Sequence, residues 1–226
     1  QVLKMEIKTF VITGANRGLG EAFVDVLMKR KDCFVISISR SITEKQQNYS
    51  LENFYFLEAD LTDNILDEKL NIIKNIVKGK EVCFINNASI IEPILKIEDI
   101  SIDALDQIIL VNIKSTILIT KYVLLHFNNF KLSFVNITSG AANRAISNWS
   151  LYCSSKAFIQ MFFKVAESEY KQHRFFNIDP GVMDTKMQRS IRESDFPDVL
   201  NFQNLKKEEK LKSPKDVALE IINTIR

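Results

Sequence analysis

Tyr152 and Lys156 stand four residues apart in a segment, residues 149–170, whose apolar residues have helical spacing. Side chains at this spacing share one face of a helix. An ammonium group beside a phenol favours the phenolate, so we expect Lys156 to lower the pKa of Tyr152 from its usual value of about 10. Such a tyrosine can donate a proton to a carbonyl oxygen as the carbonyl receives a hydride, or remove one in the reverse direction. Ser139, at the end of the preceding predicted strand, can hydrogen-bond the same oxygen.

A glycine-containing turn follows the first predicted strand directly. Gly14 permits a tight turn, Gly18 lets a pyrophosphate approach the backbone, and Gly20 lets the next helix pack close to the strand. The helix that follows offers unpaired N–H groups and the positive end of its dipole to phosphates. A plain strand-to-helix turn is the alternative, but the position after the first strand of a βαβ unit favours dinucleotide binding. We expect contacts to the dinucleotide also from the other residues of the turn, Asn16, Arg17 and Leu19.

The end of the second predicted strand indicates which dinucleotide is bound. A carboxylate there would hydrogen-bond the adenosine ribose of NAD and repel a 2′-phosphate. This chain instead has Arg40 and Ser41, and Arg17 can point to the same corner. Guanidinium groups offer a planar fork of donors that suits a phosphate. Either arginine alone could be a solvated surface residue, but together they favour NADPH over NADH.

Short apolar runs alternate with helical patterns along the whole chain, and they must position these residues. The predicted strands cover residues 8–13, 34–39, 54–59, 82–86, 132–138 and 175–178, and the predicted helices cover residues 19–29, 65–77, 102–127, 149–170 and 214–225. This alternation predicts a doubly wound α/β domain, a parallel sheet with helices on both faces in three layers. We expect a single domain over residues 1–226, in which the more polar segment at about residues 186–212 forms a helical lid.

The composition excludes several classes of protein. The chain has 226 residues, of which 46% are hydrophobic and 26% charged, with a formal net charge of +2. These values are typical of a globular domain and do not indicate nucleic acid or an anionic membrane as a partner. The apolar region at residues 108–127 is interrupted by polar residues, and residues 1–4 do not form a secretion signal, so we expect neither a membrane span nor export. Three cysteines without a CxxC pair favour a reducing cytoplasm, and two distant histidines make a metal site improbable.

Further motifs accompany the glycine turn and the Tyr152–Lys156 pair in a fixed order. They are Asp60-Leu61, Asn86-Asn87-Ala88, Asn112, Ser139 and Pro180-Gly181. The whole set resembles the short-chain dehydrogenase/reductase family, in which the spacing of 13 residues between the serine and the tyrosine is usual. Residues 136–142, 149–157 and 180–185 are similar to its sepiapterin reductase and benzil reductase branch, which uses NADPH and reduces carbonyls beside a second carbonyl or an aromatic ring.

The resemblance implies a Rossmann-type sheet in the order 3-2-1-4-5-6 and a role for each matching residue. The implied catalytic tetrad is Asn112, Ser139, Tyr152 and Lys156. By the same resemblance Lys156 also holds the nicotinamide ribose hydroxyls, and Asn112 helps to fix a water in a proton relay. The remaining implied contacts to NADP(H) are Asp60 and Leu61 at the adenine, Asn87 and Ala88 behind the adenosine ribose, and Pro180, Gly181, Met183 and Thr185 on the nicotinamide side.

The substrate and the assembly are less constrained. We expect a small-molecule carbonyl substrate to contact Ser139, Trp149, Tyr152, Gly181 and Met187, although Trp149 could equally be a packing residue. Ser89 follows Asn86-Asn87-Ala88 at the position where the family usually has a glycine, and we expect its Cβ to narrow this turn near the cofactor. The chain ends at Arg226, after a helix, where the family usually adds a strand and a tail. This difference favours a simple carbonyl reductase over a pterin reductase. It also favours a homodimer that forms through the helices at residues 102–127 and 149–170.

Two other functions are compatible with the motifs. A regulatory protein could bind NADP(H) as a sensor without turnover, although such a protein would not need an intact tetrad. A reductase of acyl-carrier or steroid-like ketones would share the tetrad but need a different pocket.

Overall fold

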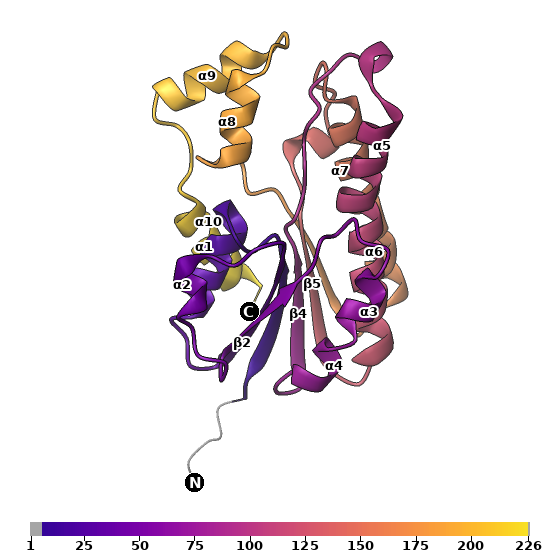
Figure 1. Cartoon of the computed structure of the whole chain (residues 1–226), viewed down its shortest axis with the longest axis vertical. Coiled ribbons are helices and arrows are strands. Elements are labelled where there is room, and N and C mark those ends of the chain that lie inside the picture. The colour runs from indigo at the N-terminus through magenta and orange to yellow at the C-terminus, as the bar shows by residue number, and fades with distance from the viewer. Residues whose placement is uncertain (1–5, 226) are drawn as a thin grey trace.

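The computed structural model describes residues 6–225, so the expectation drawn from residues 1–4 lies outside the described part of the chain. Six parallel strands form one sheet in the order β3-β2-β1-β4-β5-β6 (Figure 1). Their bounds are β1 Lys8–Thr13, β2 Cys33–Ser39, β3 Phe54–Glu58, β4 Glu81–Asn86, β5 Lys131–Ile137 and β6 Arg174–Ile178. The predicted fold class and strand order are therefore confirmed.

Both faces of the sheet are buried, which explains why its strands are continuous apolar runs. Along β1, Phe10 and Ile12 belong to one hydrophobic cluster and Val11 to another on the opposite face. Helices α1 (Gly18–Leu27) and α10 (Pro214–Thr224) cover the first face. The other face is covered mainly by α3 (Leu66–Leu70), α4 (Ile73–Ile76), α6 (Ser115–His126) and α7 (Ser150–Glu169), so that helix, sheet and helix form three layers (Figure 1).

The remaining helices differ from the predicted ones in two places. The predicted helix at residues 65–77 is two short helices, α3 (Leu66–Leu70) and α4 (Ile73–Ile76), interrupted after Asn71, a residue type that favours helix ends. The predicted helix at residues 102–127 consists of α5 (Ile102–Ile108), a π-helical turn (Ile109–Lys114) and α6 (Ser115–His126). Helix α2 (Glu44–Gln47) was not predicted, and α7 (Ser150–Glu169) matches the predicted helix at residues 149–170 to within a residue at each end.

The continuous helical stretch Ile102–His126 passes a length and hydropathy test for a membrane span, with a mean hydropathy of 1.7 over its most apolar window. Of that window, 44% is buried inside the protein. In α6, Ile119 and Val123 are fully buried in the cluster against the sheet. The buried side of this stretch is thus part of the core, whereas Ile102, Ile109 and Leu125 remain exposed.

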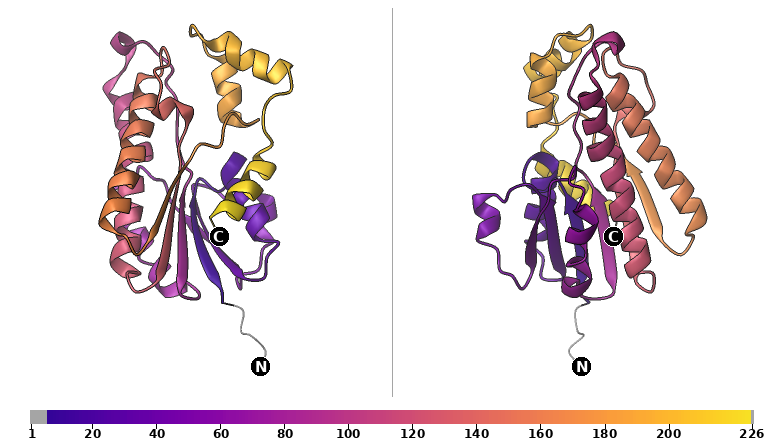
Figure 2. Two further views of the ribbon diagram at one scale, coloured as in Figure 1. Left: turned by 180° about the vertical axis from the view of Figure 1, so that it is seen from behind. Right: turned by 45° about the vertical axis from the view of Figure 1, so that its right-hand side comes forward.

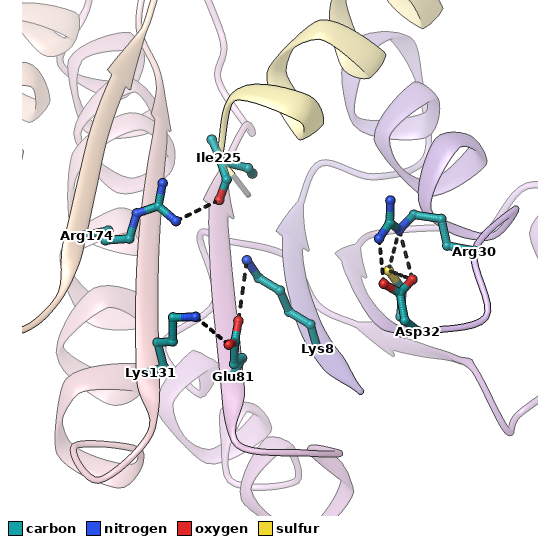
Figure 3. A network of polar contacts seen from close by, with 8 residues as sticks. Lys8, Arg30, Asp32, Glu81, Lys131, Arg174 and Ile225 are labelled. Atoms are coloured by element: carbon teal, nitrogen blue, oxygen red, sulfur yellow. Dashed lines mark hydrogen bonds and ion pairs between the residues drawn. The ribbon is translucent and has the colours of Figure 1, made fainter. Parts of the chain in front are cut away.

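Polar contacts join the amino ends of the strands, away from the ends that carry the motifs (Figure 3). Glu81 at the start of β4 lies 2.6 Å from the Nζ of Lys131 and 4.0 Å from that of Lys8. Arg174 at the start of β6 donates to the carbonyl oxygen of Ile225 beyond α10. These contacts hold together the end of the sheet that is remote from the candidate site.

Helices α8 (Lys186–Glu193) and α9 (Val199–Lys207) occupy the segment predicted to be a lid. They lie beyond the carboxyl ends of the strands, above α1 and α10 (Figures 1 and 2). A third hydrophobic cluster joins Phe196 and Phe202 of this segment to Trp149 and Tyr152 at the start of α7. The helical segment therefore packs directly on the part of the molecule that carries the predicted catalytic residues.

Candidate active site

The predicted catalytic side chains meet where β5 ends and α7 begins. Tyr152 and Lys156 occupy successive turns of α7 and are buried, with exposed fractions of 6% and 7%. The Nζ of Lys156 lies 5.7 Å from the centre of the Tyr152 ring and donates to the carbonyl oxygen of Ile137 at 2.9 Å. Ser139 follows β5 and caps a short 3-10 turn, its Oγ accepting from the main-chain N–H of Ala141 at 3.2 Å. The structure thus brings these three residues together.

The protonation of the pair differs from the sequence-based expectation. Burial raises the pKa of Tyr152 to about 12, against the opposite effect of a hydrogen bond with Ser139. Burial lowers the pKa of Lys156 to about 8, although the negative charge of Asp179 acts to raise it. The expectation that Lys156 lowers the pKa of Tyr152 is therefore wrong for this structure, because desolvation dominates and the ammonium group is directed at Ile137. The phenol keeps its proton at neutral pH, which is the state that a general acid requires.

Asn112 lies in the π-helical turn and is buried. Its side-chain oxygen accepts from the main-chain N–H of Ile90 at 2.9 Å, and its Nδ2 donates to the carbonyl oxygen of Ile90 at 2.8 Å and to the Oγ of Ser155 at 3.0 Å. Ser155 in turn donates to the carbonyl oxygen of Tyr152 at 2.9 Å. Asn112 thus ties the loop after β4 to the turn that carries Tyr152, and its role in fixing a water stays a prediction. π-helical turns occur frequently at functional sites.

The glycine turn leaves space that side chains would otherwise fill. Gly14 and Gly18 have φ values of +65° and +55°, and a Cβ on Gly20 would lie 2.1 Å from the carbonyl oxygen of Gly14. The side chain of Asn87 donates to the carbonyl oxygen of Thr13 at 3.0 Å, and the main-chain N–H of Ala88 donates to the Oγ1 of Thr13 at 3.1 Å. α1 begins at Gly18, so the N–H groups of its first turn have no partner within the helix. This geometry fits a dinucleotide pyrophosphate.

The residues predicted to choose between NAD and NADP gather at the carboxyl ends of β2 and β3. Arg40 and Arg17 are exposed, and the Nη1 of Arg40 lies 3.9 Å from a carboxylate oxygen of Asp60. Burial acts to raise the pKa of Asp60, but hydrogen bonds from Thr62 and the charge of Arg40 outweigh it and lower the pKa. Asn16 donates to the Oγ of Ser41 at 2.8 Å. Both guanidinium groups are thus open to solvent beside an ordered polar corner.

Leu61 lies apart from this polar corner. Its side chain is partly buried against the hydrophobic cluster on the α6 side of the sheet. The structure therefore shows a packing role for Leu61, and its contact with the adenine stays a prediction.

The loop after β6 covers the glycine turn. Thr185 lies close to Gly18: a Cβ built on Gly18 would stand 3.5 Å from the methyl carbon of Thr185, which is van der Waals contact. Pro180 is buried, Gly181 has a φ of +72°, and Met183 packs partly against the cluster on the α1 side. A cavity of about 370 Å³ lies between the two segments and is lined by Gly18, Asp184, Thr185, Lys186, Arg189, Ser190 and Glu193. Thr185, from the predicted nicotinamide side, and Gly18, from the predicted pyrophosphate side, therefore face one cavity.

The predicted substrate residues divide into two groups. Ser139 and Tyr152 belong to the catalytic corner formed by Ser139, Tyr152 and Lys156, whereas Gly181 lies beside Lys212, and its contact with substrate stays a prediction. Trp149 is 3% exposed, and its ring packs 5.2 Å from that of Phe202 and 5.7 Å from that of Phe196. Met187 is partly buried in the same cluster. The structure therefore shows Trp149 in a packing role, and its contact with substrate stays a prediction.

Sequence reasoning did not identify several neighbours of the catalytic corner. Phe196 and Phe202 pack on Trp149, and Asp179 and Arg144 lie beside Gly140. The two phenylalanines belong to the predicted lid, and large apolar residues in that otherwise polar segment were the sequence signal that could have indicated a packing contact. Asp179 and Arg144 lie in loops, where sequence spacing gives no direction for a side chain.

Comparisons with known proteins agree with this arrangement. Residues 8–195 match the family model described as short chain dehydrogenase. The chain is 32% identical to a benzil reductase ((S)-benzoin forming) of Bacillus cereus, covering 95% of this chain and 92% of the relative, and 26% identical to a sepiapterin reductase of Bos taurus, covering 96% and 88%. The crystal structure of the KRED1-Pglu enzyme superposes with a TM-score of 0.88 at 30% identity, covering 96% of this chain and 94% of that one. The resemblance drawn from the motifs is confirmed.

Proposed function

Since this chain belongs to the short chain dehydrogenase family, enzymes that act on CH–OH and C=O groups with NAD or NADP, we propose that it is an NADPH-dependent reductase of ketones or dicarbonyls. The observation that carries the proposal is the convergence of Ser139, Tyr152 and Lys156, with Tyr152 buried and protonated. An NADP(H) sensor would not need this arrangement.

The residues divide the reaction between them. The bound dinucleotide would supply a hydride to the carbonyl carbon. Tyr152 donates its phenolic proton to the carbonyl oxygen, so that the carbonyl becomes an alcohol, and Ser139 donates a hydrogen bond to the same oxygen as negative charge develops on it. Lys156 would hold the nicotinamide ribose, and Asn112 keeps the Tyr152 turn in place through Ser155.

The preference for NADPH rests on Arg17 and Arg40. Both are exposed at the corner where a 2′-phosphate would lie, and no carboxylate ends β2. Losing a charge-assisted hydrogen bond weakens binding by about tenfold to hundredfold. We expect Arg40→Ala to raise the KM for NADPH by such a factor and to leave the KM for NADH nearly unchanged.

The proposal is tested by following NADPH consumption with benzil or a related aromatic dicarbonyl. NADH, Tyr152→Phe and the matched control Tyr170→Phe, at the far end of α7, are assayed in parallel. We expect turnover with NADPH, much slower turnover with NADH, loss in Tyr152→Phe and retention in Tyr170→Phe. Tight NADPH binding without turnover over a wide panel of carbonyl compounds would refute the reductase and support the sensor.

We also propose a homodimer through α5–α6 and α7. Phe158, Met161 and Val165 follow one side of α7 and are 50%, 58% and 46% exposed, and Leu125 of α6 is 63% exposed. Apolar groups of this size gathered on helices are typical of an interface. Light scattering should give twice the chain mass, and Phe158→Glu should reduce it; a monomeric mass for the unaltered protein would contradict the proposal.

A cytoplasmic location is the remaining part of the proposal. Cys33, Cys83 and Cys153 are free thiols. Free thiols, two of them buried in the core, suit a reducing compartment. Fractionation of cells that express the protein tests this point.

A further inference from the structure

A second cavity, of about 480 Å³, lies between the loop that follows Ser139 and helix α9. Its apolar lining is Ala145, Ile146, Val182, Phe202 and Leu205, and its polar lining is Arg144, Asp198, Asn201, Asn204 and Glu208. Ile146 and Phe202 share a hydrophobic cluster with Tyr152, and Val182 follows Gly181. Two residues that line the cavity are therefore packed in the same cluster as Tyr152.

Arg144, an exposed residue of this lining, lies beside Gly140, the residue that follows the catalytic serine. Its Nε is 3.9 Å from the point where a Cβ on Gly140 would stand, and Gly140 is the residue after Ser139. Within residues 6–225, no hydrogen bond or ion pair joins the Arg144 side chain to another residue. A guanidinium group has five N–H donors, and here they are open to a ligand in the cavity.

The charges around Arg144 indicate what kind of ligand it would take. Asp179 has a carboxylate oxygen 3.5 Å from the same Gly140 point, and Asp198 lines the cavity from α9. Glu208 is paired with Lys210 at 2.6 Å. An anionic ligand in this cavity would meet the repulsion of these carboxylates, whereas a neutral acceptor could use the Arg144 donors without it.

We infer that Arg144 determines substrate specificity by donating a hydrogen bond to the second carbonyl oxygen of a neutral vicinal dicarbonyl. The inference rests on the proposed reductase function. Ser139 and Tyr152 hold the oxygen of the carbonyl that is reduced, and Arg144 holds the neighbouring oxygen. The apolar lining of Ile146, Val182, Phe202 and Leu205 then packs against the substituent. Arg144 thus selects dicarbonyls over simple ketones and fixes which of the two carbonyls faces Tyr152.

The inference is tested with two substrates that share a skeleton, benzil and deoxybenzoin, which lacks one of the two carbonyl oxygens. Arg144→Met removes the donors and keeps the apolar stem, and Lys207→Met on the exposed end of α9 is the matched control. We expect Arg144→Met to lower kcat/KM for benzil by about tenfold to hundredfold and to leave kcat/KM for deoxybenzoin within about twofold. Equal losses for both substrates, or no loss for either, would overturn the inference.

A binding measurement separates this inference from the proposed function. Trp149 is the single tryptophan of the chain and packs on Phe202, which lines the cavity, so its fluorescence reports on occupation of the site. In the inactive Tyr152→Phe background, benzil should bind saturably, and adding Arg144→Met should weaken that binding by a similar factor. Unchanged binding refutes the role of Arg144 even if the enzyme is active. Absence of turnover in the unaltered protein refutes the proposed function.

Discussion

Replacing Lys156 with methionine should stabilise the fold while it abolishes activity. Burial lowers the pKa of this lysine from its usual 10.5 to about 8, so a charged Lys156 at pH 7 destabilises the folded chain by about 3 kcal/mol. Loss of its hydrogen bond to the carbonyl oxygen of Ile137 offsets about 1 kcal/mol of this. Methionine has a similar length and no charge, and we expect Lys156→Met to raise the free energy of unfolding by about 2 kcal/mol at pH 7.

The pH dependence gives this prediction a second readout. The folded chain releases the Lys156 proton above about pH 8, whereas the unfolded chain keeps it until about pH 10.5. Stability of the unaltered protein should therefore rise by about 1.4 kcal/mol per pH unit within that window, and this contribution should be absent from the variant. Urea unfolding at pH 7 and pH 9.5 measures both effects, with the exposed Lys164→Met on the same helix as a control. A variant less stable than the unaltered protein at pH 7, or one with the same pH slope, would refute the reasoning.

Three further predictions follow from the site. Gly20→Ala would place a Cβ 2.1 Å from the carbonyl oxygen of Gly14, so NADPH binding measured by fluorescence titration should be lost, whereas retained affinity would contradict the tight turn described here. In the alcohol-oxidising direction Tyr152 must be deprotonated, so kcat/KM should keep rising with pH toward about 12. A plateau near pH 10 would show that the phenol is not buried during turnover, and a plateau near pH 8 would show that a positive charge lowers its pKa. Phe202→Ala should lower the free energy of unfolding by about 3 kcal/mol in urea titrations and shift the rise of the oxidation profile to lower pH, and an unchanged profile would count against the aromatic cluster as the source of burial.

The fold was predictable because its signals are local and repeated. Strands buried on both faces read as apolar runs, and the runs at residues 8–13 and 54–59 match β1 and β3 to within a residue. The strand order came from the motif resemblance, since spacing alone does not order parallel strands. The helix at residues 102–127 was less accurate, because nothing in its composition marks the π-helical turn around Asn112.

The electrostatics of the site could not be predicted from spacing. The separation of four positions from Tyr152 to Lys156 indicates that they share a helix face, but the sign of a pKa shift depends on burial and on the group that the ammonium contacts. Here the ammonium contacts Ile137, which lies on a strand 19 residues earlier. Whether Arg144 forms an ion pair likewise depends on which carboxylates the loops bring near it, and sequence spacing does not show this.

The aromatic cluster connects the helical segment α8–α9 to Tyr152, the proposed general acid. Trp149 lies with its ring 5.8 Å from that of Tyr152 and also contacts Phe196 and Phe202 of the segment. The burial that raises the pKa of Tyr152 therefore depends in part on side chains that a lid would carry away on opening. Water admitted to the phenol would bring its pKa back toward the ordinary value of about 10. In the proposed reductase, a lid motion of α8–α9 would therefore act on the proton as well as on the solvent: the packed arrangement raises the pKa of Tyr152, which suits reduction at neutral pH and would make oxidation depend on alkaline conditions.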